Sequence, residues 1–496
     1  MKRQFLAFDI GASSGRAVVG QVDADARRFE IHEVYRFTNG AIRLGNSDHW
    51  NAVALYEHVL EGLRAAKRAF GEDIESLGID TWAIDFGLLD RNGRLLGLPY
   101  CYRDMRTNGV LEQVTARIPR QRIFAETGGI QFLSFNTLYQ LVAMVETDDP
   151  LLPIAQKFLL MPDLLNYWLT GNAVSEFTNA TTTQFYNGQA GKWAHSLLGE
   201  LGIPSAMLPK VVLPGTVLGT LKPDVVESVG FANLKVIATA SHDTASAAAA
   251  IPASSENYAW LSSGTWSLLG SVADAPITGS DALRYNFSSY GGAGGRFLPW
   301  KNIMGLWLVQ ECRRIWAREG DELSFDTLAI LAEEGAPFVA FIDPDDAAFL
   351  SPVSMPIAIQ EYCQRTHQSV PSTKGEILRV AFESLALKYR WTLEKLEIIL
   401  NKKLPLLHVV GGGAQNKLLC QFAANALDRP VIAGPVEATA IGNIAVQAAA
   451  MGAVADLDVA RALIRECFDT VTYTPESREP WTHAYAQFLA ITGLEA

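Results

Sequence analysis

The sequence predicts an α/β protein built from two related domains, and three observations lead to this. At 496 residues the chain is longer than one hydrophobic core usually supports. Short apolar runs typical of strands alternate with stretches of helical periodicity along most of the chain. A strand, Ser-Ser-Gly, strand pattern stands near the start of each half, at 13–15 and 262–264. We therefore expect two mixed-sheet domains that face each other across a deep cleft.

In the first half the pattern runs strand, strand, strand, helix, strand and then a hairpin. The first two strands flank small residues and form a hairpin, the helix ends at Gly71, and the later hairpin has an Asn-Gly turn at Asn92-Gly93. The predicted ranges are 5–8, 17–19, 29–37, 51–70, 77–82, and 86–90 paired with 94–98.

The rest of the chain repeats this alternation. A helix with Pro near its start and Gly at its end is predicted at 161–171, and a plausible domain boundary follows at 252–257. The other predicted strands are 236–240, 259–261, 266–269, 404–410 and 430–433, and the other helices are 245–250, 375–400, 418–427 and 439–451. We predict a first domain at 1–250, a second at 251–455, and a helical extension at 456–496.

Composition and charge exclude several classes of function. Hydrophobic residues make up 49% and charged residues 19% of the chain, which is typical of a folded protein and not of a disordered one. The net charge is −12 with no polybasic block, so neither nucleic acid nor an anionic membrane is expected as the main partner. Nucleotides are not excluded, because local backbone groups and magnesium bind them.

Three features indicate a cytoplasmic protein. The N-terminal apolar run is interrupted by Asp9 after four residues, so no secretory signal fits it. The most apolar stretch, 441–454, contains Asn443 and Gln447 and is too short to span a bilayer. The five cysteines are scattered and form no CxxC pattern, which favours free thiols in a reducing compartment.

The segment 9–16, DIGASSGR, is the first candidate for binding a ligand. Its small side chains let backbone N–H groups approach an anion closely, and a carboxylate such as Asp9 beside phosphates usually serves a magnesium ion. It is neither a dinucleotide fingerprint nor a Walker A loop, because no helix and no Gly-Lys-Ser/Thr follow. The alternative is an ordinary polar hairpin with a surface aspartate.

Later segments add candidates, each with a structural alternative. Asp243 ends a strand and precedes an Ala-rich helix, so it is either a general base or a helix N-cap. The three glycines 411–413 follow a strand and form either an adenine platform or a turn. The polar stretch 178–183 either lines a cleft or forms a solvated turn, and Gly291–Gly295 is either a flap over a ligand or a surface loop.

Taken together, these segments resemble the FGGY family of carbohydrate kinases, within the actin-like ATPase superfamily. The resemblance covers nearly the whole chain. The stretches that carry it are DIGASSGR (9–16), IDTWAIDF (79–86), YRDMRTNG (102–109), IQFLSFNTLYQL (130–141), LMPD (160–163), TNATTTQ (178–184), SHDTASA (241–247), SSGTWSL (262–268), KNIMGLWL (301–308), VGGG (410–413) and AGPVEA (433–438). There are departures: 102–106 reads Tyr-Arg-Asp-Met-Arg where many members have Trp-x-Asp-x-Arg, and Ala83 replaces a glycine.

The resemblance implies two actin-like (ribonuclease H-like) ATPase domains and an ATP- and magnesium-dependent kinase reaction. Asp243 would accept the proton, and Asp9 would hold Mg²⁺ through water. The nucleotide would be bound by Ala12, Ser13, Ser14, Gly15, Arg16, Thr265, Gln310 and Gly412. The sugar would be bound by Ala83, His242, Asp243, Thr244 and Asn302, with Trp82, Asp85 and Arg103 as weaker candidates.

The implied substrate is L-rhamnulose, phosphorylated at its 1-hydroxyl. The same chemistry on another ketose or polyol, such as L-fuculose or L-xylulose, is the first alternative. A different class, an actin-like ATPase without a sugar substrate, leaves the 241–244 stretch without a purpose. The sequence leaves open the oligomeric state and the ring form of the sugar.

Overall fold

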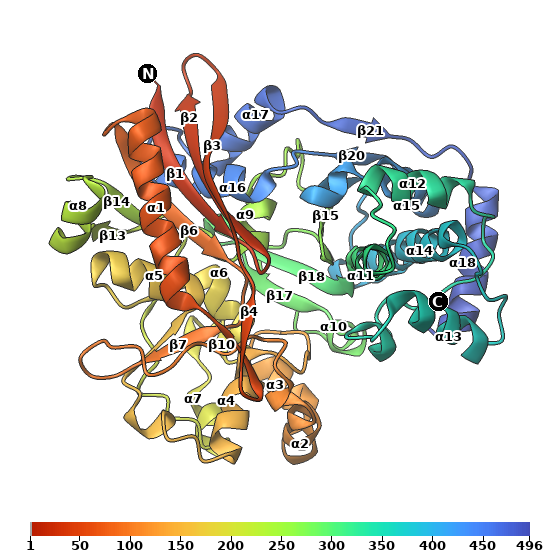
Figure 1. Cartoon of the computed structure of the whole chain (residues 1–496), viewed down its shortest axis with the longest axis horizontal. Helices are drawn as coiled ribbons and strands as arrows, with labels where there is room; N and C mark the ends of the chain where they lie inside the picture. Colours follow the sequence, from red (N-terminus) through yellow and green to blue (C-terminus); the bar gives the residue numbers. More distant parts are fainter. Residues whose placement is uncertain (1) are drawn as a thin grey trace. The chain divides into compact units, whose positions relative to one another are not determined.

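The computed structural model of the chain describes residues 2–496, which form two compact units (Figure 1). The first unit holds the residues up to Ser254 together with Ala273–Pro299 and Ala438–Cys467. The second holds Ser255–Val272, Trp300–Glu437 and Phe468–Ala496. Each unit has its own β-sheet and helices, so the predicted α/β class with two sheet-containing domains is confirmed.

The sheet of the first unit has six strands in the order β13-β14-β6-β1-β2-β3. β1, β6 and β14 run parallel, while β1, β2 and β3 form an antiparallel meander and β13 is antiparallel to β14. Their bounds are β1 (Arg3–Ile10), β2 (Ser14–Asp23), β3 (Arg28–Thr38), β6 (Ile74–Thr81), β13 (Thr216–Thr220) and β14 (Lys235–Ala238). The predicted opening hairpin and the strands predicted at 29–37, 77–82 and 236–240 are confirmed.

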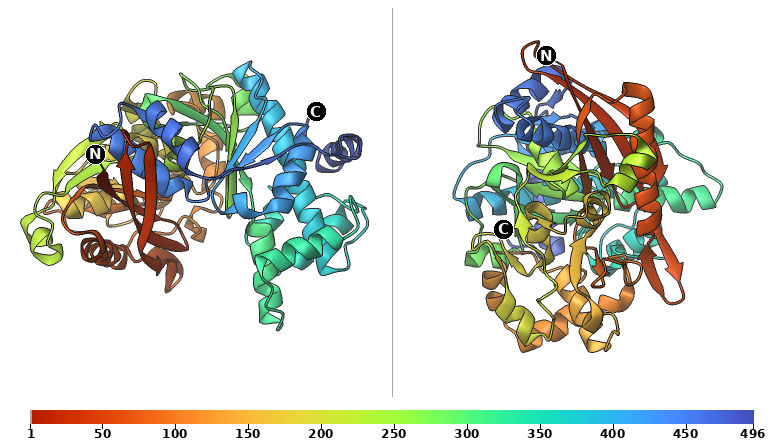
Figure 2. Two further views of the ribbon diagram at one scale, coloured as in Figure 1. Left: turned by 90° about the horizontal axis from the view of Figure 1, so that it is seen from above. Right: turned by 90° about the vertical axis from the view of Figure 1, so that its left-hand side faces the viewer.

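Helices cover both faces of this sheet (Figures 1 and 2). α1 (Ala52–Phe70) packs so closely on one face that a Cβ at Gly62 would stand 2.4 Å from the Phe8 ring. α16 (Ala438–Ala450) packs on the other face, where Ile444 lies against Gly20, and α9 (Asp243–Ala249) packs against α16. An apolar core lies where α1 and the segments 159–169 and 218–234 pack on the sheet.

Shorter elements complete the first unit. Its other helices are α2 (Val110–Arg117), α3 (Arg120–Glu126), α4 (Thr137–Glu146), α5 (Met161–Thr170), α6 (Phe177–Ala180), α7 (His195–Glu200), α8 (Pro223–Val229), α10 (Ser280–Arg284) and α17 (Leu457–Cys467). Its other strands are β4 (Ala41–Leu44), β5 (Ser47–Trp50), β7 (Phe86–Leu89), β8 (Lys157–Leu160), β9 (Ser175–Glu176), β10 (Tyr186–Asn187), β11 (Lys192–Trp193), β12 (Val211–Val212) and β17 (Ser288–Gly291). Its 3-10 turns are Met105–Thr107, Leu152–Ile154, Thr181–Thr183 and Ala293–Gly295.

The sheet of the second unit joins β18, β16, β15, β19, β20 and β21 in that order. β15 is antiparallel to β16 and parallel to β19, so a second strand-turn-strand hairpin is present where the sequence predicts one. The bounds are β15 (Ala259–Ser263), β16 (Trp266–Gly270), β18 (Phe297–Met304), β19 (Leu407–Val410), β20 (Val431–Ala433) and β21 (Val471–Tyr473).

The long helix α14 (Lys374–Leu400) is the main helix of the second unit. Its N-terminus carries a capping box in which Thr373 and Glu376 satisfy each other's backbone N–H groups. The other helices are α11 (Trp307–Arg318), α12 (Phe325–Glu334), α13 (Met355–Arg365), α15 (Lys417–Leu427) and α18 (Glu479–Thr492), with 3-10 turns at Ala347–Phe349 and Gly412–Gln415. The helices predicted at 375–400, 418–427 and 439–451 are confirmed to within one residue at each end.

One predicted hairpin is present but shorter than expected in its second strand. After the turn, 94–98 makes only an antiparallel bridge from Leu95 to Leu89 and a bond from the N–H of Leu96 to the carbonyl of Leu88 at 2.9 Å, while β7 forms its ladder with β8. The Asn-Gly turn itself is present, since the N–H of Asp90 donates to the carbonyl of Arg94 at 2.9 Å. The turn is encoded locally, whereas the strand pairing is decided by the more distant segment.

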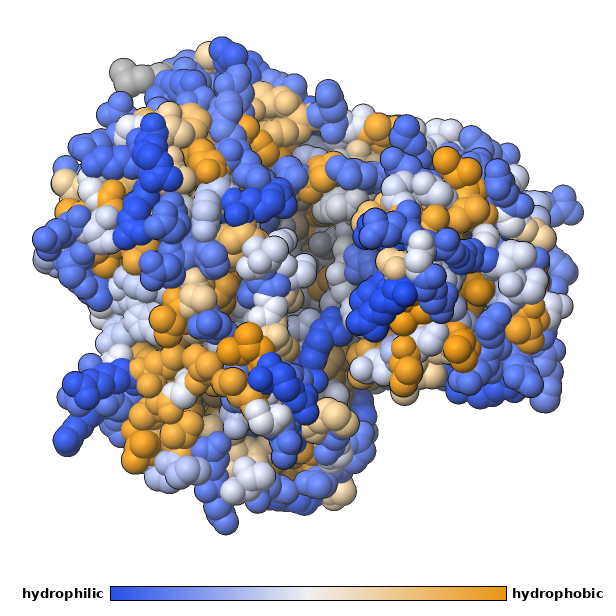
Figure 3. Space-filling model, in the orientation of Figure 1, coloured by the Kyte–Doolittle hydropathy of each residue, from blue (hydrophilic) through white to orange (hydrophobic). Residues whose placement is uncertain are grey.

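The surface and the cysteines bear on the predictions from composition. Hydrophilic side chains predominate on the face drawn in Figure 3, and apolar ones gather mainly toward its lower left. No helix among residues 2–496 combines the length and the apolar character needed to cross a membrane. All five cysteines are free thiols.

Candidate active site

The site residues predicted in the first unit gather at one edge of its sheet. β1, β6 and β14 are parallel, so their C-terminal ends meet at the same edge. Asp9 is next to last in β1, and Thr81 at the end of β6 donates its N–H to the carbonyl of Ser241 at 2.9 Å. Ala83 therefore leaves the sheet beside the segment 242–244.

Asp9 is held by Arg16 across the opening hairpin. The two residues are register partners, and Arg16 donates from Nη2 at 2.7 Å and from Nε at 3.0 Å, both to Oδ2 of Asp9. The contact leaves 12% of the Asp9 side chain exposed. Because both donors engage one oxygen, the other oxygen of Asp9 is available to a cation or to its water.

The turn at 11–14 presents an exposed pair of serines. Gly11 donates its N–H to the carbonyl of Ser14 at 2.8 Å, which closes the turn, and Ser13 and Ser14 lie exposed on it. Gly15 is buried, and a Cβ there would stand 2.2 Å from the Phe37 ring. The serines can thus approach an anion, whereas the glycine at 15 is required by packing.

Asp243 begins helix α9 as its first residue, with His242 in the cap position. The alternative that Asp243 is the N-cap is therefore wrong. Its Oδ1 accepts the N–H of Thr244 at 2.5 Å and the hydroxyl of Thr244 at 3.1 Å. Burial raises the pKa of Asp243 to about 7, and the negative charge of Asp9 adds to the rise. A carboxylate with such a pKa is suited to accept a proton near neutral pH.

His242 is a neutral side chain at this site. Burial lowers its pKa to about 3, and its Nε2 lies 3.4 Å from Oδ1 of Asp243. A neutral imidazole both donates and accepts a hydrogen bond. His242 is therefore equipped to contact a hydroxyl group, as the sequence predicts.

Glu176, which no sequence motif indicated, fixes the strand end before the candidate base. Its Oε2 accepts the N–H of Ser241 at 3.1 Å and the hydroxyl of Ser241 at 2.8 Å. It also accepts the hydroxyl of Thr178 at 2.5 Å, and Thr178 in turn accepts the N–H of His242 at 3.2 Å. Residues 178–183 are buried, so the solvated-turn interpretation of that stretch is wrong.

Asp80 is a second residue that sequence analysis did not assign. It is fully buried, and its Oδ2 accepts Nδ2 of Asn443 at 2.6 Å, while its Oδ1 has no hydrogen-bond partner. Burial and the charge of Asp9 hold the pKa of Asp80 well above its usual range. The sequence held one signal for it, namely a carboxylate within the strand predicted at 77–82. Asn443, cited from sequence only as an argument against a membrane span, is its partner on α16.

In the second unit, Thr265 and Gln310 are brought together. The hydroxyl of Thr265 donates to Oε1 of Gln310 at 3.1 Å. Trp307 donates its N–H to the carbonyl of Thr265 at 3.1 Å, which ties the β15–β16 turn to the start of α11. These two predicted nucleotide residues therefore form one group.

Asn302 lies on β18 opposite Leu268 of β16. The indole Nε1 of Trp300 donates to Oδ1 of Asn302 at 3.1 Å. This bond sets the orientation of the Asn302 amide, which fits a residue that is expected to bind a specific hydroxyl.

The three glycines after β19 differ in their surroundings. Gly411 has φ +81°, and a Cβ at Gly413 would stand 2.0 Å from Oγ of Ser263. Gly412 is exposed, and a Cβ there would meet nothing within 4 Å. Backbone strain and packing explain the two outer glycines, while Gly412 offers the bare surface predicted for a nucleotide.

The predicted residues thus form two groups, one in each unit. The first contains Asp9, Ala12–Arg16, Ala83 and His242–Thr244, and the second contains Thr265, Asn302, Gln310 and Gly412. That the two groups act on one nucleotide and one sugar stays a prediction.

Asp9 and its neighbour Asp80 fit a magnesium ion bound mainly through other ligands. Asp9 has one oxygen outside its contacts with Arg16, and Asp80 has an unpartnered buried oxygen. Within residues 2–496, no three acidic, histidine or cysteine side chains converge to hold a metal ion directly. Magnesium in phosphoryl-transfer sites usually takes one or two carboxylates, with phosphate oxygens and water completing its shell.

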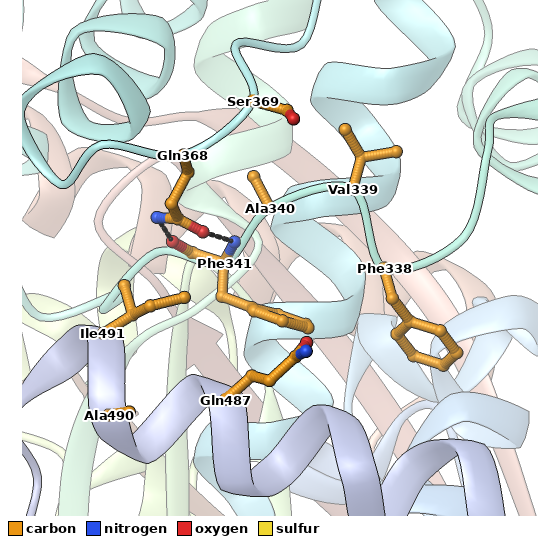
Figure 4. Close-up of a pocket in the computed structure, with 9 residues that line it drawn as sticks. All are labelled: Phe338, Val339, Ala340, Phe341, Gln368, Ser369, Gln487, Ala490 and Ile491. Atoms are coloured by element: carbon orange, nitrogen blue, oxygen red, sulfur yellow. Dashed lines mark hydrogen bonds between the residues drawn. The ribbon is translucent and has the colours of Figure 1, made fainter.

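A pocket of about 310 Å³ in the second unit contains none of these residues (Figure 4). Gln368 spans it with both side-chain atoms engaged, since Oε1 accepts the N–H of Phe341 and Nε2 donates to its carbonyl, each at 2.7 Å. The lining residues are Phe338, Val339, Ala340, Phe341, Gln368, Ser369, Gln487, Ala490 and Ile491. Because none of the predicted site residues lines it, this pocket is separate from the candidate site.

The chain is similar to known proteins over nearly its full length. Residues 4–250 match the FGGY family of carbohydrate kinases, N-terminal domain, and residues 259–451 match the C-terminal domain of the same family. A rhamnulokinase of Bacteroides thetaiotaomicron is 43% identical over 488 residues, covering 98% of this chain and 99% of the relative. A rhamnulokinase of Oceanobacillus iheyensis is 42% identical over 479 residues, covering 97% of this chain and all of the relative.

Solved structures share the fold at lower identity. Plasmodium falciparum glycerol kinase with ADP matches with a TM-score of 0.80 at 15% identity, covering 100% of this chain and 99% of that structure. Xylulose kinase from Rhodospirillum rubrum matches with a TM-score of 0.79 at 19% identity, covering 99% and 98%. These similarities confirm the predicted actin-like fold.

Proposed function

This chain belongs to the FGGY family of carbohydrate kinases, and we propose that it transfers the γ-phosphoryl group of ATP to the 1-hydroxyl of L-rhamnulose. Family membership makes it an ATP-dependent sugar kinase, a phosphotransferase with an alcohol group as acceptor. The sugar is proposed from the relatives, because several rhamnulokinases are 40% to 43% identical over nearly the whole chain. The products are L-rhamnulose 1-phosphate and ADP, which places the reaction in L-rhamnose breakdown.

The alternatives have less support. A kinase for L-fuculose or L-xylulose would use the same chemistry and differ only in the contacts to the sugar. An actin-like ATPase without a sugar substrate is not favoured, because both domain matches are to carbohydrate kinases.

The observation that carries the mechanism is Asp243 at the sheet edge, with its pKa raised to about 7 by burial and by the charge of Asp9. Above this pH the carboxylate is ionised, and it accepts the proton of the sugar hydroxyl as that oxygen attacks the γ-phosphorus. The bond between the γ-phosphorus and its bridging oxygen breaks, and ADP leaves. Thr244 holds the orientation of Asp243 through two hydrogen bonds.

Positioning supplies much of the rate in phosphoryl transfer, because the transition state is loose and the protein adds little covalent chemistry. We assign the sugar to Ala83, His242 and Thr244, beside the base, and to Asn302 of the second unit. His242 contributes as a neutral donor or acceptor, since its pKa is lowered to about 3 by burial. L-Rhamnulose carries hydroxyls for these groups and a methyl group for an apolar wall such as Trp82 or Phe86.

The nucleotide is assigned to residues from both units. Ala12–Arg16 and Thr265 are proposed to contact its phosphates, while Gln310 and Gly412 hold the rest of the molecule. A Mg²⁺ ion held through water by Asp9 would offset phosphate charge when bound. Arg16 is proposed to balance charge in the transition state, and its two bonds to Asp9 support a role in keeping that carboxylate in position.

We also propose a cytoplasmic location, which the five free thiols support.

The proposal is tested by coupling ADP production to NADH oxidation across L-rhamnulose, L-fuculose, L-xylulose and glycerol, with a no-sugar reaction as the control. L-Rhamnulose should give the highest kcat/KM. Glycerol should be very poor, because it leaves buried polar groups of the site unpaired. A higher kcat/KM for another sugar would overturn the assignment of L-rhamnulose as the substrate. ADP production at the same rate with and without every sugar would overturn the assignment as a sugar kinase.

A further inference from the structure

Asp85 is a fully buried carboxylate that gathers four donors. Its Oδ2 accepts the indole Nε1 of Trp50 at 2.6 Å, the indole Nε1 of Trp82 at 3.0 Å and the backbone N–H of Tyr102 at 3.1 Å. Its Oδ1 accepts Nε2 of Gln140 at 2.9 Å. With both oxygens engaged inside the protein, Asp85 itself has little capacity to bind a ligand.

The residue before it adopts a strained conformation. Ile84 has φ +70°, and the N–H of Asp85 donates to the carbonyl of Ala83 at 2.9 Å, so the three residues form a γ-turn with positive φ at its centre. This turn is rare and strained, most of all with a β-branched residue in the middle. It persists only where its surroundings hold it. The hydroxyl of Thr137 donates to the carbonyl of Ile84 at 2.7 Å, and the N–H of Met161 donates to the carbonyl of Asp85 at 3.1 Å.

The turn and the two indoles form one packed cluster beside the candidate base. Trp50 and Trp82 pack with ring centroids 4.2 Å apart, and Asp85 accepts a bond from each. The chain enters the turn from Thr81, whose N–H donates to the carbonyl of Ser241 next to the 242–244 stretch. The half-buried Ala83 and the buried Trp82 ring are thus placed by the contacts of Asp85.

We infer that Asp85 is a positioning residue for the acceptor sugar, holding the strained Ala83–Asp85 turn and the Trp82 ring in the shape that the sugar meets. Asp85 therefore sets the affinity and the choice of sugar without touching it. This inference rests on the proposed function in one respect, namely that Ala83 and the 242–244 stretch bind the acceptor. The weaker prediction that Asp85 binds sugar directly is replaced by this indirect role.

The charge on Asp85 suits four donors. Burial raises its pKa to about 6, and hydrogen bonds from Gln140, Trp50, Trp82 and Tyr102 oppose the rise, so the carboxylate is ionised at pH 7.5 and above. Gln140 has a fixed orientation, because its Oε1 accepts Nη2 of Arg106 at 2.7 Å while its Nε2 faces Asp85. Arg106 stacks over the Tyr100 ring at 3.8 Å, which leaves it little freedom to move.

This orientation supplies a test by exchange of groups. In Asp85→Asn, the NH₂ group of the new amide must face another hydrogen-bond donor. This donor is either the set of three N–H groups at Oδ2 or Nε2 of Gln140. Gln140 cannot turn over to accept without losing its bond from Arg106. In the double variant Asp85→Asn/Gln140→Glu, the oxygen of the new amide at position 85 accepts the three N–H groups, and its NH₂ donates to the new carboxylate at position 140. That carboxylate still pairs with Arg106, and the net charge equals that of the wild type. The bond that Nε2 of Gln140 donates to the carbonyl of Phe135 at 3.1 Å is lost in this variant, so the rescue is expected to be partial.

The experiment compares the wild type, the single variant and the double variant on whichever ketose the wild type phosphorylates best. Asp85→Asn should raise the KM for the sugar about 10–100-fold while the KM for ATP changes less than about twofold. The double variant should lower the sugar KM at least about fivefold relative to the single variant, and should restore the near-UV circular dichroism of the buried indoles. The control Asp90→Asn alters a carboxylate that caps a hairpin turn through the N–H groups of Asn92 and Arg94, and should leave both KM values unchanged.

An unchanged sugar KM in a folded Asp85→Asn protein, or a double variant no better than the single one, would overturn the inference. If Asp85→Asn does not fold, Trp50→Phe removes one of the four bonds and decides the matter, since an unchanged sugar KM there also overturns it. Failure of the proposed function is separate, because it appears as a wild type that prefers a sugar other than L-rhamnulose.

Discussion

Replacing Asp243 by asparagine removes the proposed base and keeps the size of the side chain. The oxygen of the new amide can still accept the N–H of Thr244, which Asp243 accepts at 2.5 Å. Helix α9 also keeps His242 as its cap. The substitution therefore tests proton transfer with little change in local structure.

The expected loss follows from the role and from the pKa. A positioned general base contributes about 10²–10⁴ in rate, which corresponds to about 2.7–5.4 kcal/mol of activation free energy. Because burial and the charge of Asp9 place the pKa of Asp243 at about 7, wild-type kcat/KM should fall about tenfold per pH unit below that value. This acid limb should be absent from the residual activity of Asp243→Asn.

The assay is steady-state ADP production from pH 5.5 to 9, with ATP affinity measured separately by titration calorimetry. Intact ATP binding with turnover reduced at least about 100-fold is the expected result. A folded Asp243→Asn protein whose kcat stays within tenfold of the wild type, or whose acid limb persists near pH 7, would refute the assignment.

Three further outcomes are expected. Asp243→Asn should raise thermal stability at pH 8, because the folded protein raises the pKa of Asp243 from 3.8 to about 7, so the stability of the wild type falls as pH rises through that range. With 32% of the side chain exposed, the gain should be about 1–2 kcal/mol; it should vanish near pH 4, and calorimetric scans showing the opposite trend would contradict it. Glu176→Gln should lower kcat about 10–100-fold with smaller changes in both KM values, since Glu176 fixes Ser241 two residues before the base; kinetics identical to the wild type would argue against this role. L-Fuculose should be phosphorylated with a kcat/KM between those of L-rhamnulose and glycerol, because it keeps the methyl group and differs in hydroxyl configuration; a competition assay in which it outpaces L-rhamnulose would refute the subfamily.

Local patterns predicted much of the fold. The helical period of 375–400 gave α14 to within one residue, because a long helix is determined by its own sequence and caps. The small residues of 9–16 likewise indicated the β1–β2 hairpin. The second strand of the 86–98 hairpin is shorter than predicted, because β7 forms its ladder with 157–160. Such a pairing depends on tertiary packing and leaves no local signal.

The sequence likewise predicted only some of the residues of the candidate site. Asp243, His242 and Asp9 stand out because each lies at a strand end in a polar motif. Asp80 and Glu176 were not assigned, because their partners are distant: Asn443 lies 363 residues from Asp80, and Ser241 lies 65 residues from Glu176. A single sequence shows the carboxylates without showing what they hold. Asp85 was noticed for its position in the motif, but its role follows only from four hydrogen bonds that sequence does not reveal.

The central claim is that this chain phosphorylates L-rhamnulose at C1, and the product tests it most directly. C1 of the open-chain ketose is its only carbinol CH₂ position, so a phosphate there couples to two protons and gives a triplet in the proton-coupled ³¹P spectrum. The proposal predicts that ATP and L-rhamnulose yield this triplet in proportion to the ADP formed. A doublet from a secondary phosphate ester, or ADP accompanied only by inorganic phosphate, would contradict the claim.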